Sequence, residues 1–231
     1  MNGLRAVFLL LVMVLMPLVP VYIWFKKKKF GTLRFLLAAA AGVLTVLVAG
    51  LAQSFFPMHL YGTSHLTQLL YSIIIRVSLI EELSRALLLF LLFYFIPYSR
   101  IMFKGGQESG PYMRSAPFFG AASGLAAGLG FAVGENIFYS LADPGIAFLR
   151  LSSAAVHGTC GIRVGAALGN ISKSRFNAFS LFISAVLIHS IFNFSILNPV
   201  IPVFLPVFIA FTALASSLVS VYFGNRNANL Y

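Results

Sequence analysis

Long apolar runs separated by short polar breaks dominate the sequence. A membrane-spanning helix needs about 20 predominantly apolar residues. Seven runs approach this length, at approximately residues 5–25, 35–56, 67–97, 116–140, 146–168, 177–196 and 200–222. The breaks between them contain Pro, Gly and polar residues, which favour turns. The pattern predicts an all-α fold, a polytopic transmembrane helix bundle with about seven spanning helices.

We expect this bundle to form one transmembrane domain, residues 1–231, with a candidate catalytic core at residues 67–197. The run at 67–97 is longer than one span requires, so it is expected to be tilted or broken. The composition agrees, because the chain is 60% hydrophobic and 9% charged, with mean hydropathy +0.95. A soluble domain is about a quarter charged, so lipid is the expected surrounding of this protein.

The basic residues predict how the helices are oriented in the membrane. Lys and Arg occur in the first, third and fifth loops and in the C-terminal tail, whereas the second, fourth and sixth loops contain none. These residues are Lys26, Lys27, Lys28, Lys29, Arg34, Arg100, Lys104, Arg114, Lys173, Arg175 and Arg226. Because cytoplasmic loops carry the excess of positive charge, we expect the N-terminus outside and the C-terminus in the cytoplasm. The expected location is the cell (inner or plasma) membrane, with several passes.

The net charge of +11 also bears on the partners of the protein. In a soluble protein this charge would indicate nucleic acid, but here no soluble segment is large enough to bind it. Basic loops next to a membrane instead favour contact with anionic lipid. We therefore expect membrane lipid as a partner and no nucleic acid. Cys160 is the only cysteine, so an intrachain disulfide is excluded.

Five ionisable residues inside the apolar runs are the first candidates for function. They are Glu81, Glu82, Glu135, His157 and His189. An ionisable group near the bilayer centre costs at least about 2.5–3.5 kcal/mol, and such groups normally face the bundle interior and serve a function. Counting about 1.5 Å of rise per residue, we expect all five to converge at one level in the outer half of the bilayer.

The motif Glu81-Glu82-x-x-Arg85 places two carboxylates and a cation within two helical turns. Glu81 and Arg85 are four residues apart and should share one helix face, while Glu82 should point about 100° away, towards a neighbouring helix. Two adjacent carboxyls in a low dielectric do not both ionise easily. One carboxyl would then be ionised and act as a base, and the other would be protonated and act as an acid. Hydrolysis needs both roles. The alternative is an Arg–Glu pair that only fixes helix packing.

Three further helices carry polar residues at positions that suit catalysis. Glu135 is followed by Asn136, and His157 lies near the middle of the next run. His189 and Asn193 are four residues apart, share a face and can donate hydrogen bonds to a developing oxyanion. The alternatives are a hydrogen-bonding core residue for His157 and a simple interhelical pair for His189 and Asn193.

Glycines recur every fourth residue in the same two central runs. They are Gly120, Gly124 and Gly128, then Gly161, Gly165 and Gly169. Small residues at this spacing let membrane helices approach closely. We interpret these glycines as packing residues.

Three motifs together resemble the PrsW family of intramembrane proteases. They are Glu81-Glu82-x-x-Arg85, Phe131-x-x-x-Glu135 with Asn136, and His189-x-x-x-Asn193, and the resemblance spans roughly residues 70–197. They are also similar to the wider superfamily of CAAX-prenyl endopeptidases and bacteriocin-processing proteins. The second motif has the PrsW-type Glu, whereas Arg85 and Asn193 are closer to the CAAX type.

The resemblance implies a membrane-embedded endopeptidase that cuts peptide bonds with an activated water. The implied substrate is a single-pass membrane protein or peptide, such as an anti-sigma factor, cut near the extracytoplasmic face. In this hypothesis Glu81 or Glu82 is the general base, assisted by Glu135 or His157. His189 and Asn193 would hold the oxyanion, and Arg85 and Asn136 would orient the reacting groups.

The sequence favours a glutamate-based mechanism without a metal, because no compact His-Glu-x-x-His motif is present. Zinc is the alternative cofactor, since Glu and His are ligands that suit it. Three other functions compete with this one. They are a CAAX-type prenyl-protein endopeptidase, a proton-coupled transporter that uses the Glu and His residues as a relay, and a non-catalytic scaffold.

Overall fold

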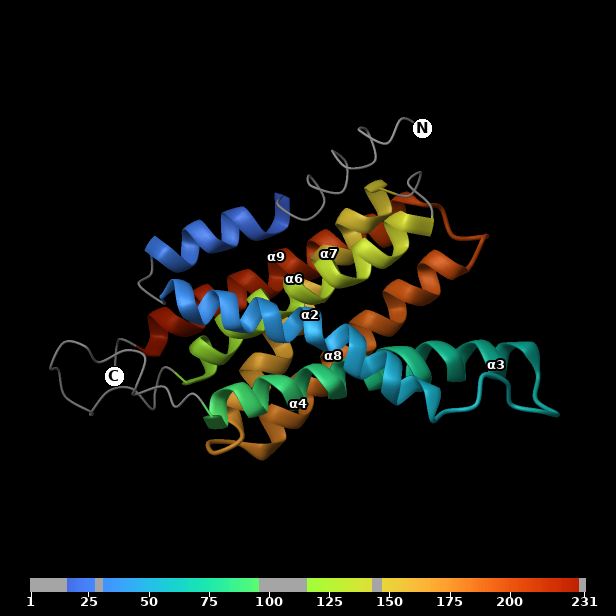
Figure 1. The fold of residues 1–231 in the computed structure, drawn as a ribbon, viewed down its shortest axis with the longest axis horizontal. Helices are drawn as coiled ribbons and strands as arrows, with labels where there is room; N and C mark the ends of the chain where they lie inside the picture. Colours follow the sequence, from blue (N-terminus) through green and yellow to red (C-terminus); the bar gives the residue numbers. More distant parts are fainter. Residues whose placement is uncertain (1–15, 28–30, 96–115, 143–146, 229–231) are drawn as a thin grey trace, which may run out of the picture.

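The computed structural model describes residues 16–27, 31–95, 116–142 and 147–228, and among these residues it contains helices and no β-strand. The helices comprise residues 16–27, α2 (Thr32–Ser54), α3 (His65–Leu70), η1 (Tyr71–Leu79), α4 (Ile80–Phe95), α6 (Ala116–Ala142), α7 (Ala147–Asn170), α8 (Arg175–Leu197) and α9 (Phe204–Ala228). Figure 1 shows most of them lying along the longest axis of the molecule. The prediction of an all-α bundle is therefore confirmed.

The helical segments coincide with the apolar runs of the sequence. Three helical stretches are long and apolar enough to cross a membrane, namely Thr32–Ser54, Pro117–Ile137 and Arg175–Leu197. Two of these stretches, in α6 and α8, carry the motif residues Glu135 and His189. The seven-span count and the orientation stay predictions, since residues 5–15 and the basic loop at 96–115 lie outside the described residues.

Residues 65–95, which include the described part of the long run at 67–97, form one continuous helix whose pitch changes along its length. It starts after Ser64, whose hydroxyl accepts a hydrogen bond from the Thr67 amide at 3.2 Å and so caps the helix. Its middle part, η1, is a π-helix, and the α-helical pitch resumes at Ile80. A π-helical stretch inside a helix is rare and frequently lies at a functional site. The expected break is therefore a change of pitch immediately before Glu81.

Helices α6 and α7 form the centre of the bundle. In α6, 83% of the apolar span is buried, against 28% in α2 and 33% in α8. A Cβ atom on Gly124 would lie 1.9 Å from the carbonyl oxygen of Gly161, and one on Gly120 would lie 2.0 Å from that of Gly165. Only glycine permits this backbone-to-backbone contact, so the packing role predicted for Gly120, Gly124, Gly128, Gly161 and Gly165 is confirmed, whereas that of Gly169 stays a prediction.

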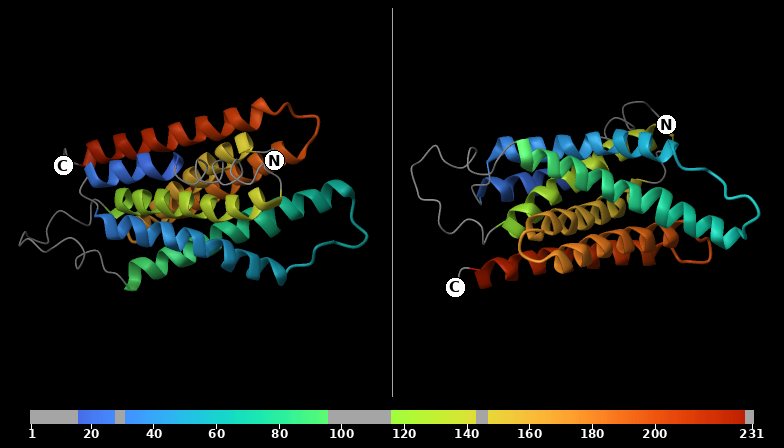
Figure 2. Two further views of the ribbon diagram at one scale, coloured as in Figure 1. Left: turned by 45° about the horizontal axis from the view of Figure 1, so that its top comes forward. Right: turned by 90° about the horizontal axis from the view of Figure 1, so that it is seen from below.

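The remaining helices surround this central pair. Helix α2 packs on α6 and α4, α8 packs on α7 and η1, and α9 packs on α7. The two views of Figure 2 show α2, α4 and α8 close to the central pair. Because α2, α4, α6, α7 and α8 meet in this way, polar residues on their inward faces can gather in one buried region.

Candidate active site

The five ionisable residues that the sequence analysis selected lie together inside the bundle. Glu81 and Glu82 come from the first turn of α4, Glu135 from α6, His157 from α7 and His189 from α8. Glu82 is fully buried, and Glu81, His157 and His189 are at most 8% exposed. Each residue contacts at least one other of the group, so the predicted convergence is observed. Their catalytic roles stay predictions.

Glu82 joins two of these helices. One of its carboxylate oxygens pairs with the guanidinium of Arg85, one turn further along α4. The other, Oε1, accepts a hydrogen bond from Nδ1 of His189 at 2.8 Å. Glu82 therefore reaches the neighbouring helix, as predicted. Glu81 was expected to share a helix face with Arg85, but Arg85 pairs with Glu82, and Glu81 is turned towards Gln53 of α2.

Glu81 has one engaged oxygen and one free oxygen. Its Oε1 accepts a hydrogen bond from the side-chain amide of Gln53 on α2 at 3.3 Å. Its Oε2 is buried, has no hydrogen bond, and lies 3.6 Å from Nε2 of His189. Because Nδ1 of His189 donates to Glu82, the Nε2 of the neutral ring carries a lone pair. Two lone-pair atoms thus face each other, and a proton, a water molecule or a metal ion between them would relieve their repulsion.

His157 is held from both sides. Its Nδ1 lies 3.3 Å from a guanidinium nitrogen of Arg85, which can only donate. Its Nε2 therefore carries the hydrogen and donates to Glu135 at 2.9 Å. Glu135 also accepts a hydrogen bond from Ser153 at 3.2 Å and lies 4.0 Å from the guanidinium of Arg150. These contacts fix the ring of His157 and place it next to His189.

Phe131, from the Phe-x-x-x-Glu motif, packs against this polar group. Its ring lies 4.5 Å from the His157 ring and 4.9 Å from the guanidinium carbon of Arg85. The rings of His157 and His189 meet edge to face at 5.0 Å. Phe131 is 2% exposed and so shields one side of the ion pairs from solvent. Charges in such surroundings interact more strongly than in water.

The two asparagines of the motifs occupy different surroundings. Asn136 is buried at 1% exposure, directly after Glu135. Asn193 is half-buried on α8, one turn beyond His189, and no hydrogen bond joins its side chain to the described residues. Asn193 is therefore available to a bound ligand. The orienting roles predicted for both residues stay predictions.

Three contacts of the cluster were not anticipated from the sequence. Gln53 holds Glu81, while Ser153 and Arg150 hold Glu135. Ser153 lies one helical turn before His157 on the same face, so its spacing in the sequence could have indicated that it belongs to the cluster. Gln53 is a long polar side chain in an otherwise apolar helix, which is a similar signal. Arg150 gave no such indication, because a residue near a helix end can equally extend to the interface.

The charges and donor atoms of the cluster suit a divalent metal ion. Three carboxylates face two guanidiniums, those of Arg85 and Arg150, which leaves an excess of one negative charge when both histidines are neutral. Donor atoms of Glu81, His157 and His189 lie within 4.8 Å of one another. A second set, Glu82 with Cys160 and His189, meets the same limit, but its carboxylate is occupied by Arg85. Glu81, with its free Oε2, is the better ligand.

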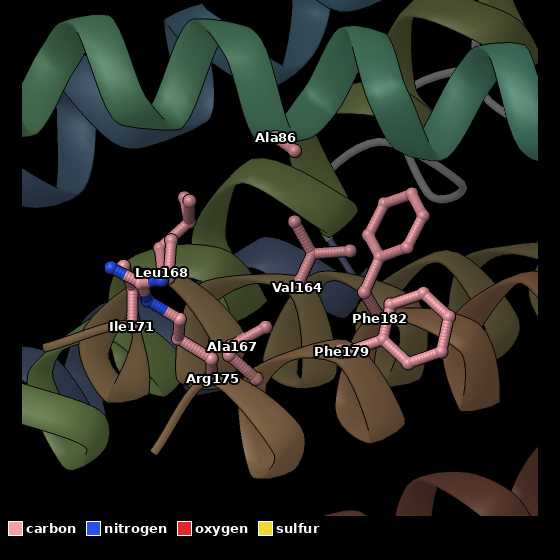
Figure 3. A pocket seen from close by; sticks show the side chains of 9 residues that line it. Ala86, Val164, Ala167, Leu168, Ile171, Arg175, Phe179 and Phe182 are labelled. Carbon is pink, nitrogen blue, oxygen red and sulfur yellow. The ribbon is translucent and has the colours of Figure 1, made fainter. Parts of the chain in front are cut away.

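An apolar pocket lies beside the cluster and is distinct from it. It has a volume of about 260 Å³ and is lined by residues of α4, α7 and α8, as Figure 3 shows. Its wall includes Ala86, which follows Arg85 in the sequence, together with Val164 and Phe182, and Arg175 supplies its charged group. The pocket therefore offers apolar contact, and the groups able to do chemistry lie in the buried cluster.

The sequence match agrees with this arrangement. Residues 31–217 match the family model described as PrsW family intramembrane metalloprotease. The chain belongs to the PrsW family. It is thus a membrane protein with intramembrane protease function, and the whole cluster falls inside the matched region. No curated protein and no solved structure gives a significant match to the chain.

Proposed function

We propose that the buried cluster is the catalytic centre of this PrsW-family protease and that it hydrolyses peptide bonds of a membrane-anchored protein. The observation that carries the proposal is the 3.6 Å approach of the Glu81 Oε2, which has no hydrogen bond, to the His189 Nε2. A water molecule beside these two atoms could donate one hydrogen to each of them, which would fix its orientation. The site could therefore bind the water molecule that acts as the nucleophile in hydrolysis.

The chemistry assigns a separate role to each carboxylate. Glu81 takes a proton from the attacking water, whose oxygen bonds to the carbonyl carbon of the substrate. The same proton then passes to the nitrogen of the breaking C–N bond, so that a free acid and a free amine leave. Glu82 keeps His189 in the required orientation through its 2.8 Å hydrogen bond. Glu135 does the same for His157, and Asn193 donates to the oxyanion.

The family description names a metalloprotease, and the donor set fits one divalent ion. Glu81 Oε2 and His189 Nε2 would hold it, with Glu82 supporting His189 in the way that carboxylates support metal-bound histidines. His157 would be the third ligand if its Nδ1 released the guanidinium of Arg85. When bound, such an ion acidifies a coordinated water and polarises the substrate carbonyl. The metal-free mechanism favoured on the sequence finds no support in the family description. We therefore propose the metal-dependent version.

The substrate in this proposal is a single-pass membrane protein cut near the extracytoplasmic side. The cluster lies within apolar helices, so the scissile bond must itself enter the membrane region. The predicted outside location of the N-terminus places Glu135 and His189 in the outer half of the bilayer. An anti-sigma factor is a substrate of this kind, and its cleavage would start a stress response.

A cleavage assay in proteoliposomes tests the proposal. Purified protein is incubated with a panel of single-pass substrates, and fragments are identified by mass spectrometry. We expect wild type to cleave at one position and His189→Ala to lose activity by about two to four orders of magnitude. His65→Ala, an exposed histidine of α3, is the matched control and should keep full activity. Cleavage by His189→Ala at the wild-type rate would contradict the assignment.

The metal is tested separately by elemental analysis of the same preparations. Wild type should retain about one divalent ion per chain after gel filtration, and His189→Ala should lose it. The control His65→Ala should bind as wild type does. Full cleavage by a protein stripped of divalent ions would exclude the metal-dependent version and restore the glutamate-only mechanism.

A further inference from the structure

A hydroxyl group three residues before the Glu-Glu motif has no hydrogen-bond partner among the described residues. Ser78, the penultimate residue of η1, is fully buried, and its Oγ makes no hydrogen bond with the described residues. A buried hydroxyl without a partner costs roughly 1–3 kcal/mol. Such an atom therefore requires an explanation, and a bound polar ligand is the simplest one.

Four other buried hydroxyls, all in α-helices, make a local hydrogen bond that Ser78 lacks. Thr45, Thr159, Ser190 and Ser195 each donate to the carbonyl oxygen four residues earlier, at 2.7–2.9 Å. This local bond is typical of Ser and Thr inside α-helices. In a π-helix the backbone hydrogen bonds span five residues, so the carbonyl of Ile74 is displaced from its α-helical position. The unusual pitch of η1 thus leaves the Ser78 hydroxyl free.

The free hydroxyl lies on the same buried face as Glu82. Ser78, Glu82, Arg85 and Leu89 are spaced four, three and four residues apart, and all four are 0% exposed. This spacing defines one helix face, and the η1 end of that face packs against α8, which carries His189. Ser78 is also three residues from Glu81, and side chains at that spacing are neighbours about 5–6 Å apart at their Cβ atoms.

We propose that Ser78 binds the nucleophilic water together with Glu81 and His189. A buried water makes about three hydrogen bonds. Ser78 Oγ and Glu81 Oε2 are both buried without a hydrogen bond, their residues are three positions apart, and His189 Nε2 lies 3.6 Å from the Glu81 oxygen. The hydroxyl fixes the direction of the water so that one of its lone pairs faces the substrate carbonyl. This inference rests on the function proposed above and adds a residue that the three motifs do not contain.

The test uses a pair of serines that differ only in location. Ser217 on α9 is also buried, at 2% exposure, and its hydroxyl likewise makes no hydrogen bond with the described residues. Ser78→Ala and Ser217→Ala each remove an unsatisfied hydroxyl and introduce a better helix former. Both variants should unfold at the wild-type temperature or above it. The two variants should differ in their cleavage rates.

We expect Ser78→Ala to lower kcat about tenfold with KM unchanged, which corresponds to the loss of one hydrogen bond that acts after substrate binding. Ser217→Ala should cleave at the wild-type rate. Ser78→Thr, which keeps the hydroxyl, should recover most of kcat. Metal content should be the same in all three, because the hydroxyl is not a proposed ligand.

Two results would overturn the inference. One is a kcat for Ser78→Ala equal to that of Ser217→Ala. The other is a parallel fall of kcat and unfolding temperature in Ser78→Ala that Ser78→Thr does not reverse, which would indicate a structural role. Glu81→Gln is run beside them to separate the two proposals. Cleavage that survives in Glu81→Gln removes the proposed function itself, whereas its loss there with unchanged Ser78→Ala removes only the role of Ser78.

Discussion

The interface between α6 and α7 and the contact region of η1 and α4 with α8 are both buried, but they are built on opposite principles. In the first, glycines bring two backbones into direct contact, and Cβ atoms at Gly120 or Gly124 would overlap a carbonyl oxygen. In the second, Glu82, Arg85 and His189 connect the helices through polar side chains. The glycine interface leaves no room for a ligand, whereas the polar region keeps buried atoms unsatisfied.

This difference separates stability from chemistry within one core. Close-packed small residues are how membrane helices associate where no hydrophobic driving force exists between them. Unsatisfied polar atoms weaken a structure, and natural proteins keep them where function requires them. We therefore expect substitutions in the glycine interface to act on folding, and substitutions in the polar region to act first on cleavage.

The largest effect on folding should come from Gly124→Ala. Its Cβ would lie 1.9 Å from the carbonyl oxygen of Gly161, which is a backbone atom that cannot move away cheaply. We expect a destabilisation of more than about 3 kcal/mol, beyond ordinary overpacking, measured by thermal unfolding in detergent. Gly50→Ala is the matched control, because nothing lies within 4 Å of its Cβ position in α2. Equal unfolding temperatures for the two variants would contradict the backbone contact.

The two adjacent glutamates should respond differently to the same substitution. Glu82→Gln leaves the fully buried Arg85 without its charged partner, so we expect a destabilisation of about 3–5 kcal/mol together with loss of cleavage. Glu81→Gln removes the general base, which is also a proposed metal ligand, but leaves the pair of Arg85 and Glu82 intact. It should therefore keep the unfolding temperature while cleavage falls about two to four orders of magnitude. Measurement of both quantities in both variants checks this. Identical behaviour would mean that the pairing with Arg85 is wrongly assigned.

A smaller effect on cleavage is expected at Glu135, which lies on α6 and forms a hydrogen bond with His157. Glu135→Gln preserves the shape but weakens the 2.9 Å hydrogen bond to His157. Residues that support a ligand in this way contribute about 10–100-fold to activity or metal affinity. Cleavage kinetics and metal content should both show a loss in this range. Ser153→Ala, which removes a hydroxyl bonded to the same carboxylate, should have a smaller effect.

The smallest effect should follow Cys160→Ala. The thiol is fully buried and its only hydrogen bond with the described residues is a 3.4 Å contact to the Ala185 carbonyl oxygen. We expect a stability loss of about 1 kcal/mol, typical of a modest core substitution, with metal content unchanged. This variant also distinguishes the two donor sets, since loss of the metal in Cys160→Ala would favour the set with Glu82 over the set with Glu81.

The sequence predicted the helices and the convergence of the five ionisable residues because two simple signals are strong in membrane proteins. One is the length of the apolar runs, and the other is the cost of a charge inside them. The glycine spacing of α6 and α7 was equally direct. These features depend on local spacing and burial, which a single chain displays without knowledge of its tertiary contacts.

The pairing inside the cluster could not be predicted in the same way. Helical spacing allows Arg85 to reach either Glu81 or Glu82, and the choice depends on the helices that pack around them. The contact of Gln53 with Glu81 joins residues 28 positions apart and follows from the packing of α2 on α4. The π-helical pitch of η1, which frees Ser78, likewise gave no periodic signal in the apolar pattern.

The central claim is that the polar cluster performs hydrolysis while the glycine interface only holds the fold. Its most direct test is one measurement of substrate cleavage by Glu81→Gln, with the unfolding temperature recorded on the same preparation. The account predicts an unfolding temperature like that of wild type and a cleavage rate at least about a hundredfold lower. Cleavage at the wild-type rate by this folded variant would contradict the account.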